Sequence, residues 1–190
     1  MSKKRGEDPA SGGERSGAQS RPRGTGPDRL WAPWRIAYFT EPQPDECIFC
    51  TIPALDEAAD RETHIVARYD RCYVIMNKYP YSNGHLMVVP YDHAPDMSGL
   101  DEATRAEILK VAGDCATVLG EELQAHGFNI GFNLGTAAGA GIIDHIHLHV
   151  VPRWHGDTNY MPVLADTKVL SESLEGTYDR LRPAFDKLNT

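Results

Sequence analysis

The sequence of 190 residues predicts an α+β fold: an antiparallel sheet of about five strands with a long packed helix and a C-terminal helix. Short apolar segments separated by turn residues lie before and after one long stretch with helical spacing. The last segment, residues 145–151, alternates histidines with large apolar residues, and a period of two is typical of a strand. The length suits one well-buried domain rather than two large ones.

The strands are expected at residues 64–69, 72–77, 85–91, 128–134 and 145–152. Asp70-Arg71 fits a hairpin turn between the first two strands. Asn83-Gly84 fits a turn before the third. The last two are joined by a loop of small residues, 135–141. Two strands, a turn and a strand, a helix and two more strands favour an antiparallel sheet.

The long helix is expected to begin near Ser98 or Asp101, both of which are good capping residues, and to end at His126-Gly127. Apolar residues recur along it at helical spacing, with charged residues on the other side, which predicts a face packed on the core. These residues are Ile108, Val111, Ala112, Cys115, Val118, Leu119 and Leu123. A last helix is predicted over roughly 166–182, before Pro183.

The N-terminus differs from the rest of the chain in composition. Residues 1–27 are rich in Gly, Ser, Pro and charge, which predicts a disordered basic tail. Residues 28–190 are expected to form a single domain, opened by an aromatic arm at 30–39. That arm could contact a second subunit, the functional site or simply the core.

The charge and hydropathy pattern restricts the partners and the compartment. The net charge is −8, and the acidic body makes nucleic acid an unlikely main partner. No run approaches the roughly 20 apolar residues of a membrane span. No apolar stretch follows the basic N-terminus, so we expect no signal peptide and a cytoplasmic location.

The four cysteines fall into two groups. Cys72 and Cys115 lie in apolar contexts and are expected to be buried thiols. Cys47 and Cys50 form Cys-Ile-Phe-Cys, which in a reducing compartment is a candidate metal or redox pair.

His145, His147 and His149 are the strongest functional signal, because a strand places all three imidazoles on one face. Ile146 and Leu148 then point to the other face, which can be buried. An affinity tag would not interleave its histidines with large apolar residues. This row therefore predicts either a metal site or a site where an imidazole acts as a nucleophile.

The pattern His-φ-His-φ-His-φ-φ, where φ is apolar, resembles the histidine triad superfamily. Further segments resemble that family in the same order, over roughly residues 45–155: Asn77-Lys78-Tyr79-Pro80, Asn83 to Pro90 and Phe128 to Gly135. The resemblance implies a histidine triad fold. It also implies a homodimer, in which the sheets of two subunits join.

The resemblance assigns chemistry to individual residues. The middle histidine, His147, corresponds to the nucleophile, which would form a covalent nucleotidyl-histidine. His149 and His85 would contact phosphate oxygens and position His147, although His85 alone would be interpreted as a core histidine. Asn77 corresponds to the ribose-binding residue, and Asn133 to a phosphate-contacting amide.

The loop at 135–141 fits a phosphate cradle, because small residues such as Gly139 and Gly141 let backbone N–H groups approach an oxyanion. Many relatives of the hydrolase type carry Gln with Ser or Thr just before the triad. Here Ala140-Gly141-Ile142 replaces those side chains, which leaves room for an acceptor bulkier than water.

Segments on both sides of the triad are most similar to bacterial diadenosine tetraphosphate phosphorylases, which transfer adenylyl to inorganic phosphate and give ADP and ATP. Asn133-Leu134-Gly135-Thr136 and Val150 to Trp154 carry this similarity. Trp154 and Arg153 would bind the distal part of the substrate or fold back structurally. Alternatives are a dinucleoside polyphosphate hydrolase, a nucleoside phosphoramidase and a nucleotide-binding regulatory protein. No organic cofactor is implied.

The resemblance also implies a structural zinc site. Some relatives complete a CxxC pair with a histidine after the third strand and with the first triad histidine. In this sequence the four ligands would be Cys47, Cys50, His93 and His145, a closed set for Zn²⁺. Free thiols or a redox pair are the alternative.

Overall fold

The computed structural model describes residues 46–157 and 170–188. The expected basic tail at 1–27, the aromatic arm at 30–39 and the first residues of the predicted last helix, 166–169, lie outside the described residues.

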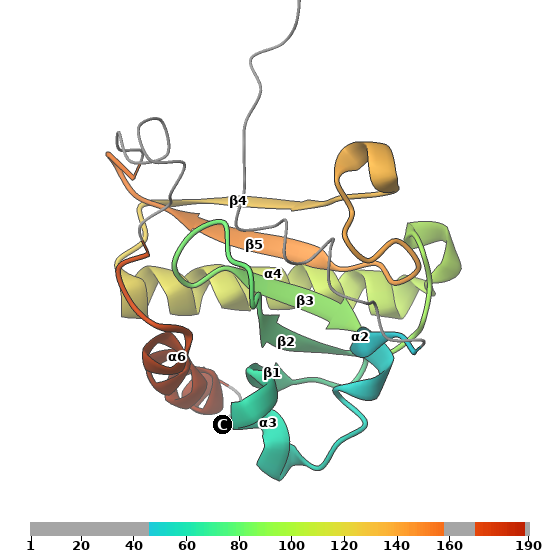
Figure 1. Ribbon diagram of the computed structural model, residues 1–190, viewed down its shortest axis with the longest axis horizontal. Coiled ribbons are helices and arrows are strands. Elements are labelled where there is room, and N and C mark those ends of the chain that lie inside the picture. Colours follow the sequence, from blue (N-terminus) through green and yellow to red (C-terminus); the bar gives the residue numbers. More distant parts are fainter. Residues whose placement is uncertain (1–45, 158–169, 189–190) are drawn as a thin grey trace, which may run out of the picture. The chain divides into compact units, whose positions relative to one another are not determined.

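Within the described residues, five strands form one sheet in the order β1-β2-β3-β5-β4 (Figure 1). They are β1 Ile65–Arg68, β2 Cys72–Met76, β3 Leu86–Pro90, β4 Gly127–Phe132 and β5 Leu148–Arg153. Every neighbouring pair is antiparallel. The predicted α+β class and the antiparallel sheet of about five strands are therefore confirmed.

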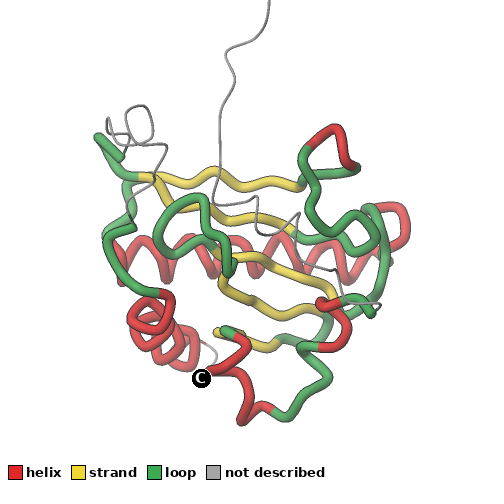
Figure 2. Tube along the Cα trace, in the orientation of Figure 1, coloured by secondary structure: helices red, strands yellow, loops and turns green. Residues whose placement is uncertain are grey.

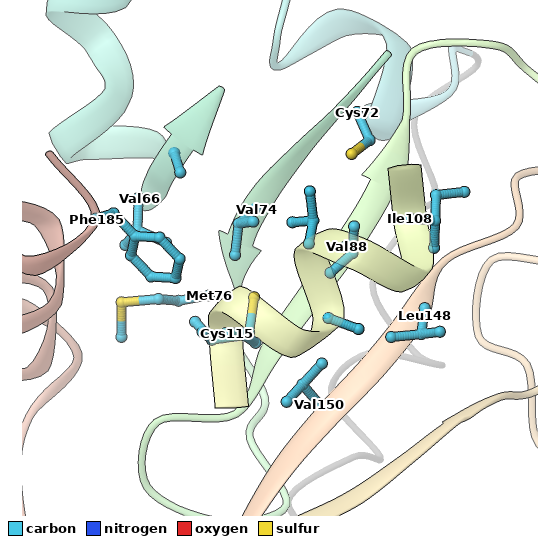
Figure 3. Close-up of a cluster of buried hydrophobic side chains, with 14 of the residues drawn as sticks. Val66, Cys72, Val74, Met76, Val88, Ile108, Cys115, Leu148, Val150 and Phe185 are labelled. Atoms are coloured by element: carbon cyan, nitrogen blue, oxygen red, sulfur yellow. The ribbon is translucent and has the colours of Figure 1, made fainter. Parts of the chain in front are cut away.

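One face of the sheet carries the main hydrophobic core. The long helix α4 Glu102–Leu123 runs along this face, and α6 Leu174–Leu188 lies beside it near β1 (Figures 1 and 2). Alternate residues of the inner strands meet α4, as Figure 3 shows for Val74, Val88 and Val150. α4 begins after Asp101, whose carboxylate accepts from the Thr104 N–H at 2.6 Å. No helix in the described part of the chain is long and apolar enough to cross a membrane.

The opposite face carries a smaller apolar cluster, formed by Phe49 and by strand residues that point away from α4: Ile65, Tyr73, Ile75, Met87 and Val89. Phe49 comes from α2 Ile48–Thr51, one of several short helices that periodicity did not predict. The others are η2 Glu57–Ala59, α3 Asp60–Thr63, η3 Met97–Gly99 and η4 Thr136–Ala138. Each has only three or four residues, too few for a periodic apolar stripe.

The strand predicted over 145–152 begins later, at Leu148. Its pairing with β3 stops at Val88↔Leu148, and β3 ends at Pro90, which has no N–H to donate. The backbone N–H of Ile146 instead donates to the Ala94 carbonyl at 2.7 Å. Side chains still alternate before the strand, because Ile146 joins the α4 core while the histidines on either side do not.

The last helix also departs from its predicted range of 166–182. Residues 170–173 are not helical, and α6 begins at Leu174. Ser173 caps its start, with its hydroxyl accepting from the Gly176 N–H at 3.1 Å. The helix continues past Pro183, because Leu181 and Phe185 on either side are fully buried in the core.

A buried carboxylate connects three elements at the β1 edge of the sheet. Asp60 in α3 accepts from Arg68 of β1 at 2.6 Å and from Arg182 of α6 at 3.1 Å. Arg182 also donates to the Ile65 carbonyl at 3.4 Å. A buried carboxylate between two guanidinium groups holds α3 and α6 against β1.

We predict that Asp60→Asn lowers the free energy of unfolding by about 2–4 kcal/mol, because it leaves two partly buried arginines without their carboxylate. Urea denaturation measures this loss. The matched control is Asp179→Asn, which breaks the exposed ion pair with Arg61 and should leave stability almost unchanged. Equal losses in the two variants would contradict the prediction.

Candidate active site

His147 is held in the form that leaves one ring nitrogen ready to attack. Its Nδ1 lies 2.9 Å from the backbone carbonyl of His145. A carbonyl can only accept, so Nδ1 carries the proton and the lone pair is on Nε2. The ring is buried, and burial lowers its pKa, so the imidazole is neutral at neutral pH. Its ring centroid lies 4.9 Å from those of Phe49 and His149.

A hydrogen-bonded chain fixes the other two histidines. The backbone N–H of Tyr81 donates to His85 Nδ1 at 3.1 Å, so the proton of His85 lies on Nε2. His85 Nε2 is 3.0 Å from His149 Nδ1 and donates to it. The proton of His149 therefore lies on Nε2, where it can serve an external acceptor.

The two asparagines border this chain. Asn77 Oδ1 accepts from the Tyr79 N–H at 2.9 Å, which directs its amide nitrogen toward His85 Nδ1 at 3.3 Å. The amide of Asn133 lies 3.4 Å from His149 Nε2. Since that nitrogen is a donor, the natural partner is the Asn133 carbonyl oxygen, with the two ends of the amide exchanged.

A tight turn brings His85 into this chain. Gly84 has φ +71°, and a Cβ there would lie 2.4 Å from Leu123 Cδ1 on α4. Only glycine tolerates both the left-handed backbone and this close approach. The turn before β3 therefore needs glycine at position 84, and His85 follows it fully buried.

A cavity of about 370 Å³ opens beside the histidines. Its apolar wall includes Ile48, Phe49, Ile52, Ile75, Met87 and Ile142. Its polar wall includes Asn77, Asn133, Gly139, Gly141, His147 and His149. An apolar pocket with a few convergent polar groups is typical of a small-molecule site.

The structure thus brings together most of the residues predicted to bind nucleotide, but not Trp154. The Trp154 indole donates to the Leu123 carbonyl at 3.1 Å and packs against the core on the α4 side. It does not line this cavity. The folded-back arrangement is the one observed.

The loop between β4 and β5 contains a single helical turn. Gly135 and Gly139 both have positive φ and flank the single turn η4. The Ala140 N–H donates back to the Gly135 carbonyl at 3.3 Å. This closed turn presents Gly139 and Gly141 to the cavity.

Sequence reasoning missed the apolar wall that α2 supplies. Ile48 and Phe49 lie between the two cysteines, and α2 turns both residues toward the cavity. The sequence did carry a signal: both residues inside the CxxC motif are apolar, although a metal site needs only the two cysteines as ligands. Glu62, Thr63 and His64 at the end of α3 also border the cavity, and no pattern indicated them.

The four predicted metal ligands form one cluster. Cys47, Cys50, His93 and His145 have ligand atoms that all lie within 4.8 Å of one another. The His145 Nδ1 is 3.3 Å from Cys47 Sγ and 3.5 Å from Cys50 Sγ. His93 Nδ1 is 3.3 Å from Cys50 Sγ. Tetrahedral Zn²⁺ separates a sulfur and a nitrogen ligand by roughly 3.5 Å, so the donor set fits this metal.

The surroundings of the cluster prepare it for a cation. His145 Nε2 donates to the Pro90 carbonyl at 2.9 Å, which leaves Nδ1 unprotonated toward the thiols. Burial, followed by contact with the Cys47 thiol, raises the pKa of Cys50. A bound cation would offset this effect, because it stabilises a coordinating thiolate.

Comparison with known proteins identifies the family. The HIT domain model matches residues 58–156, about half of the chain. The chain belongs to the HIT domain family. The AP-4-A phosphorylase of Mycobacterium tuberculosis is 38% identical over 158 residues, which cover 78% of this chain and 80% of that protein.

Solved structures agree with this assignment. A Zn-bound histidine triad family protein from Mycobacterium smegmatis has a TM-score of 0.60 and 30% identity, and the match covers 76% of this chain and 96% of that one. A hypothetical histidine triad nucleotide-binding protein from Sulfolobus tokodaii also gives 0.60, at 28% identity, over 75% of this chain and 94% of that one. The histidine triad fold inferred from the sequence is confirmed.

Proposed function

We propose that this HIT protein transfers a nucleotidyl group from a dinucleoside polyphosphate, such as diadenosine tetraphosphate, through His147. The Nε2 lone pair attacks the α-phosphorus, and the bond from that phosphorus to the bridging oxygen breaks. ATP leaves, and AMP remains joined to His147. The observation that carries this proposal is the Nδ1–H bond to the His145 carbonyl, which leaves Nε2 as the nucleophile.

His149 and His85 act on the phosphate in this scheme. When substrate binds, His149 Nε2–H donates to a phosphate oxygen in place of the Asn133 amide oxygen, and His85 holds His149 through their 3.0 Å hydrogen bond. Asn77 binds the ribose hydroxyls, while Asn133, Gly139 and Gly141 surround the phosphates. No organic cofactor takes part.

The acceptor that we propose is inorganic phosphate. A phosphate oxygen attacks the nucleotidyl-His147, the P–N bond breaks, and the product is ADP. Two observations support phosphorolysis: Ala140-Gly141-Ile142 lacks the Gln and Ser or Thr side chains of hydrolase-type relatives, and a relative that is 38% identical is an AP-4-A phosphorylase. Hydrolase, phosphoramidase and regulatory binding activities are the alternatives.

We further propose that the Cys47, Cys50, His93 and His145 cluster holds one Zn²⁺. The similar M. smegmatis protein was crystallised Zn-bound, and the donor set here has the composition of a structural site. The ion would anchor the α2 segment to the end of β3 and would orient His145. Reduced thiols of this kind suit the cytoplasm, which we propose as the location.

A homodimer through β4 completes the proposal. β4 is an outer strand that pairs only with β5 in the described part, and Ile130 on it is 47% exposed. An uncovered strand edge is a template for pairing with another chain.

Product analysis tests the proposed function most simply. Diadenosine tetraphosphate with phosphate should give ADP and ATP, at a rate that rises with phosphate concentration and saturates. Chromatography of the products with and without phosphate distinguishes the acceptors. Release of AMP and ATP at a rate indifferent to phosphate would make the protein a hydrolase.

We predict that His147→Asn lowers turnover by at least roughly a thousandfold, because His149 and His85 each carry their proton on Nε2 and only His147 of the three presents an unprotonated Nε2. AMP binding, measured by calorimetry, should persist. The matched control is His126→Asn, an exposed histidine that contacts His155 and does not line the cavity. An adenylyl group trapped on His149 would overturn the assignment.

Metal analysis of protein purified without chelator should find about one zinc per chain. Cys47→Ser should lose the ion and melt at a lower temperature, because metal binding is coupled to folding. Cys115→Ala provides the control, since this cysteine is buried on α4 against the other face. Zinc-free wild-type protein with the same melting temperature would exclude the site.

Light scattering should give twice the mass of one chain. Ile130→Lys should shift the protein toward monomer, because it places a charge at the edge of the sheet. A monomeric wild type at micromolar concentration would contradict the dimer.

A further inference from the structure

Asn77 and His85 are neighbours across the two strands at the point where the β2–β3 ladder ends. The ladder pairs Met76 with Leu86, and one residue further the Asn77 N–H donates to the His85 carbonyl at 2.9 Å. Residues opposite each other on two strands project to the same face. Asn77 lines the 370 Å³ cavity, whereas His85 is only 1% exposed. The asparagine therefore lies between the space for a ligand and a buried histidine.

The backbone of the following loop fixes the orientation of the Asn77 amide. The Tyr79 N–H can only donate, so the amide atom 2.9 Å from it is the oxygen, Oδ1. The amide nitrogen is then the atom that lies 3.3 Å from His85 Nδ1. The two ends of an asparagine amide often cannot be told apart, but a backbone donor decides between them here.

The Nδ1 atom of His85 thus faces two N–H donors. One is the backbone N–H of Tyr81 at 3.1 Å, and the other is the Asn77 amide. A proton on Nδ1 would point at the hydrogens of both donors, so this nitrogen stays unprotonated and Nε2 carries the proton. The Tyr81 ring also stacks on the His85 ring, with centroids 4.7 Å apart, and keeps the imidazole in this orientation.

The tautomer of His85 decides what His149 offers to a phosphate. His85 Nε2–H donates to His149 Nδ1 at 3.0 Å, which leaves the proton of His149 on Nε2. If the proton of His85 moved to Nδ1, the His149 proton would move to its own Nδ1 to keep this hydrogen bond. Each ring would still hold one proton, but His149 would then present a lone pair to the phosphate oxygens. His147 would be unaffected, because a backbone carbonyl fixes its tautomer.

We propose that Asn77 is a positioning residue for the phosphate donor as well as a ribose ligand. Its amide N–H keeps His85 Nδ1 unprotonated, and His85 passes this constraint to His149 Nε2. The proposal rests on the proposed function, because a bound nucleotide supplies the phosphate that His149 serves. It adds a role that a contact with the sugar alone does not include.

The test uses Asn77→Asp, which keeps an oxygen for the Tyr79 N–H and for the ribose but replaces the N–H donor toward His85 with an acceptor. The substrates are the p-nitrophenyl ester of AMP and its 2′,3′-dideoxy analogue, which has no ribose hydroxyls. The variant should lower kcat/KM at least about tenfold on both, the effect of losing a hydrogen bond to a charged group.

Nitrogen-15 NMR of the histidine rings reads the tautomer directly. The chain has eight histidines, and the His85 signals are those absent from His85→Gln. In the wild type the His85 signals should report an unprotonated Nδ1. In Asn77→Asp they should report a proton on Nδ1, because the carboxylate accepts from it. A purely structural role for Asn77 would not move this proton.

Asn77→Leu is the second variant, because it removes the amide without adding a charge that could repel the nucleotide. It should lose activity on the dideoxy ester as well, though less than Asn77→Asp, since the Tyr81 N–H still faces Nδ1. Asn83→Ala is the matched control. Its amide lies in the same turn, but its oxygen accepts from Thr177 of α6 and it does not line the cavity, so neither kinetics nor spectrum should change.

The outcomes separate this proposal from the one on which it rests. An unchanged His85 spectrum in Asn77→Asp would overturn it. Losses confined to the ester with ribose hydroxyls would also overturn it, because Asn77 would then act through the sugar alone. A wild type that cleaves the ester but leaves diadenosine tetraphosphate intact would instead overturn the proposed function, while the ester and the spectra would still report the role of Asn77.

Discussion

The 2.9 Å hydrogen bond from His147 Nδ1 to the carbonyl of His145 decides what the rest of the site can do. It holds the ring proton away from the cavity and leaves the Nε2 lone pair facing it. His145 is itself fixed, because its Nε2 donates to the Pro90 carbonyl and its Nδ1 faces the two thiols. One residue thus joins the nucleophile, the end of β3 and the cysteine segment.

The sheet allows these histidines to be buried because its two faces have different environments. Leu148 and Val150 pack on α4, while His147 and His149 face the cavity. Burying imidazoles would be unfavourable without partners. His85, His145, His147 and His149 are all buried, and each has a hydrogen-bond partner in the protein. The resulting network sets the tautomer of each of these four rings.

Patterns of period two and 3.6 predicted the strands, the long helix and the histidine face, because burial on one side repeats along each of these elements. These patterns could not show where pairing stops. The strand was expected to begin at His145, but it begins at Leu148, because Pro90 at the end of β3 has no N–H to donate. The α2 and α3 turns are too short to carry a period, and the Asp60 network joins residues far apart in sequence. Trp154 shows a different limit: its position beside the triad said nothing about which face its side chain takes. The CxxC motif indicated Cys47 and Cys50 as a metal or redox pair, but only the family resemblance joined them to His93 and His145, because these histidines lie far away in the sequence.

The stereochemistry at the α-phosphorus tests the central claim of a nucleotidyl-His147 intermediate most directly. Diadenosine tetraphosphate carrying one sulfur at a chiral α-phosphorus would be cleaved, and the configuration of the thio-nucleotide product would be determined by phosphorus NMR. Attack by His147 and then by the acceptor inverts the centre twice, so the account predicts overall retention. Overall inversion would mean a single direct displacement by the acceptor and would contradict it.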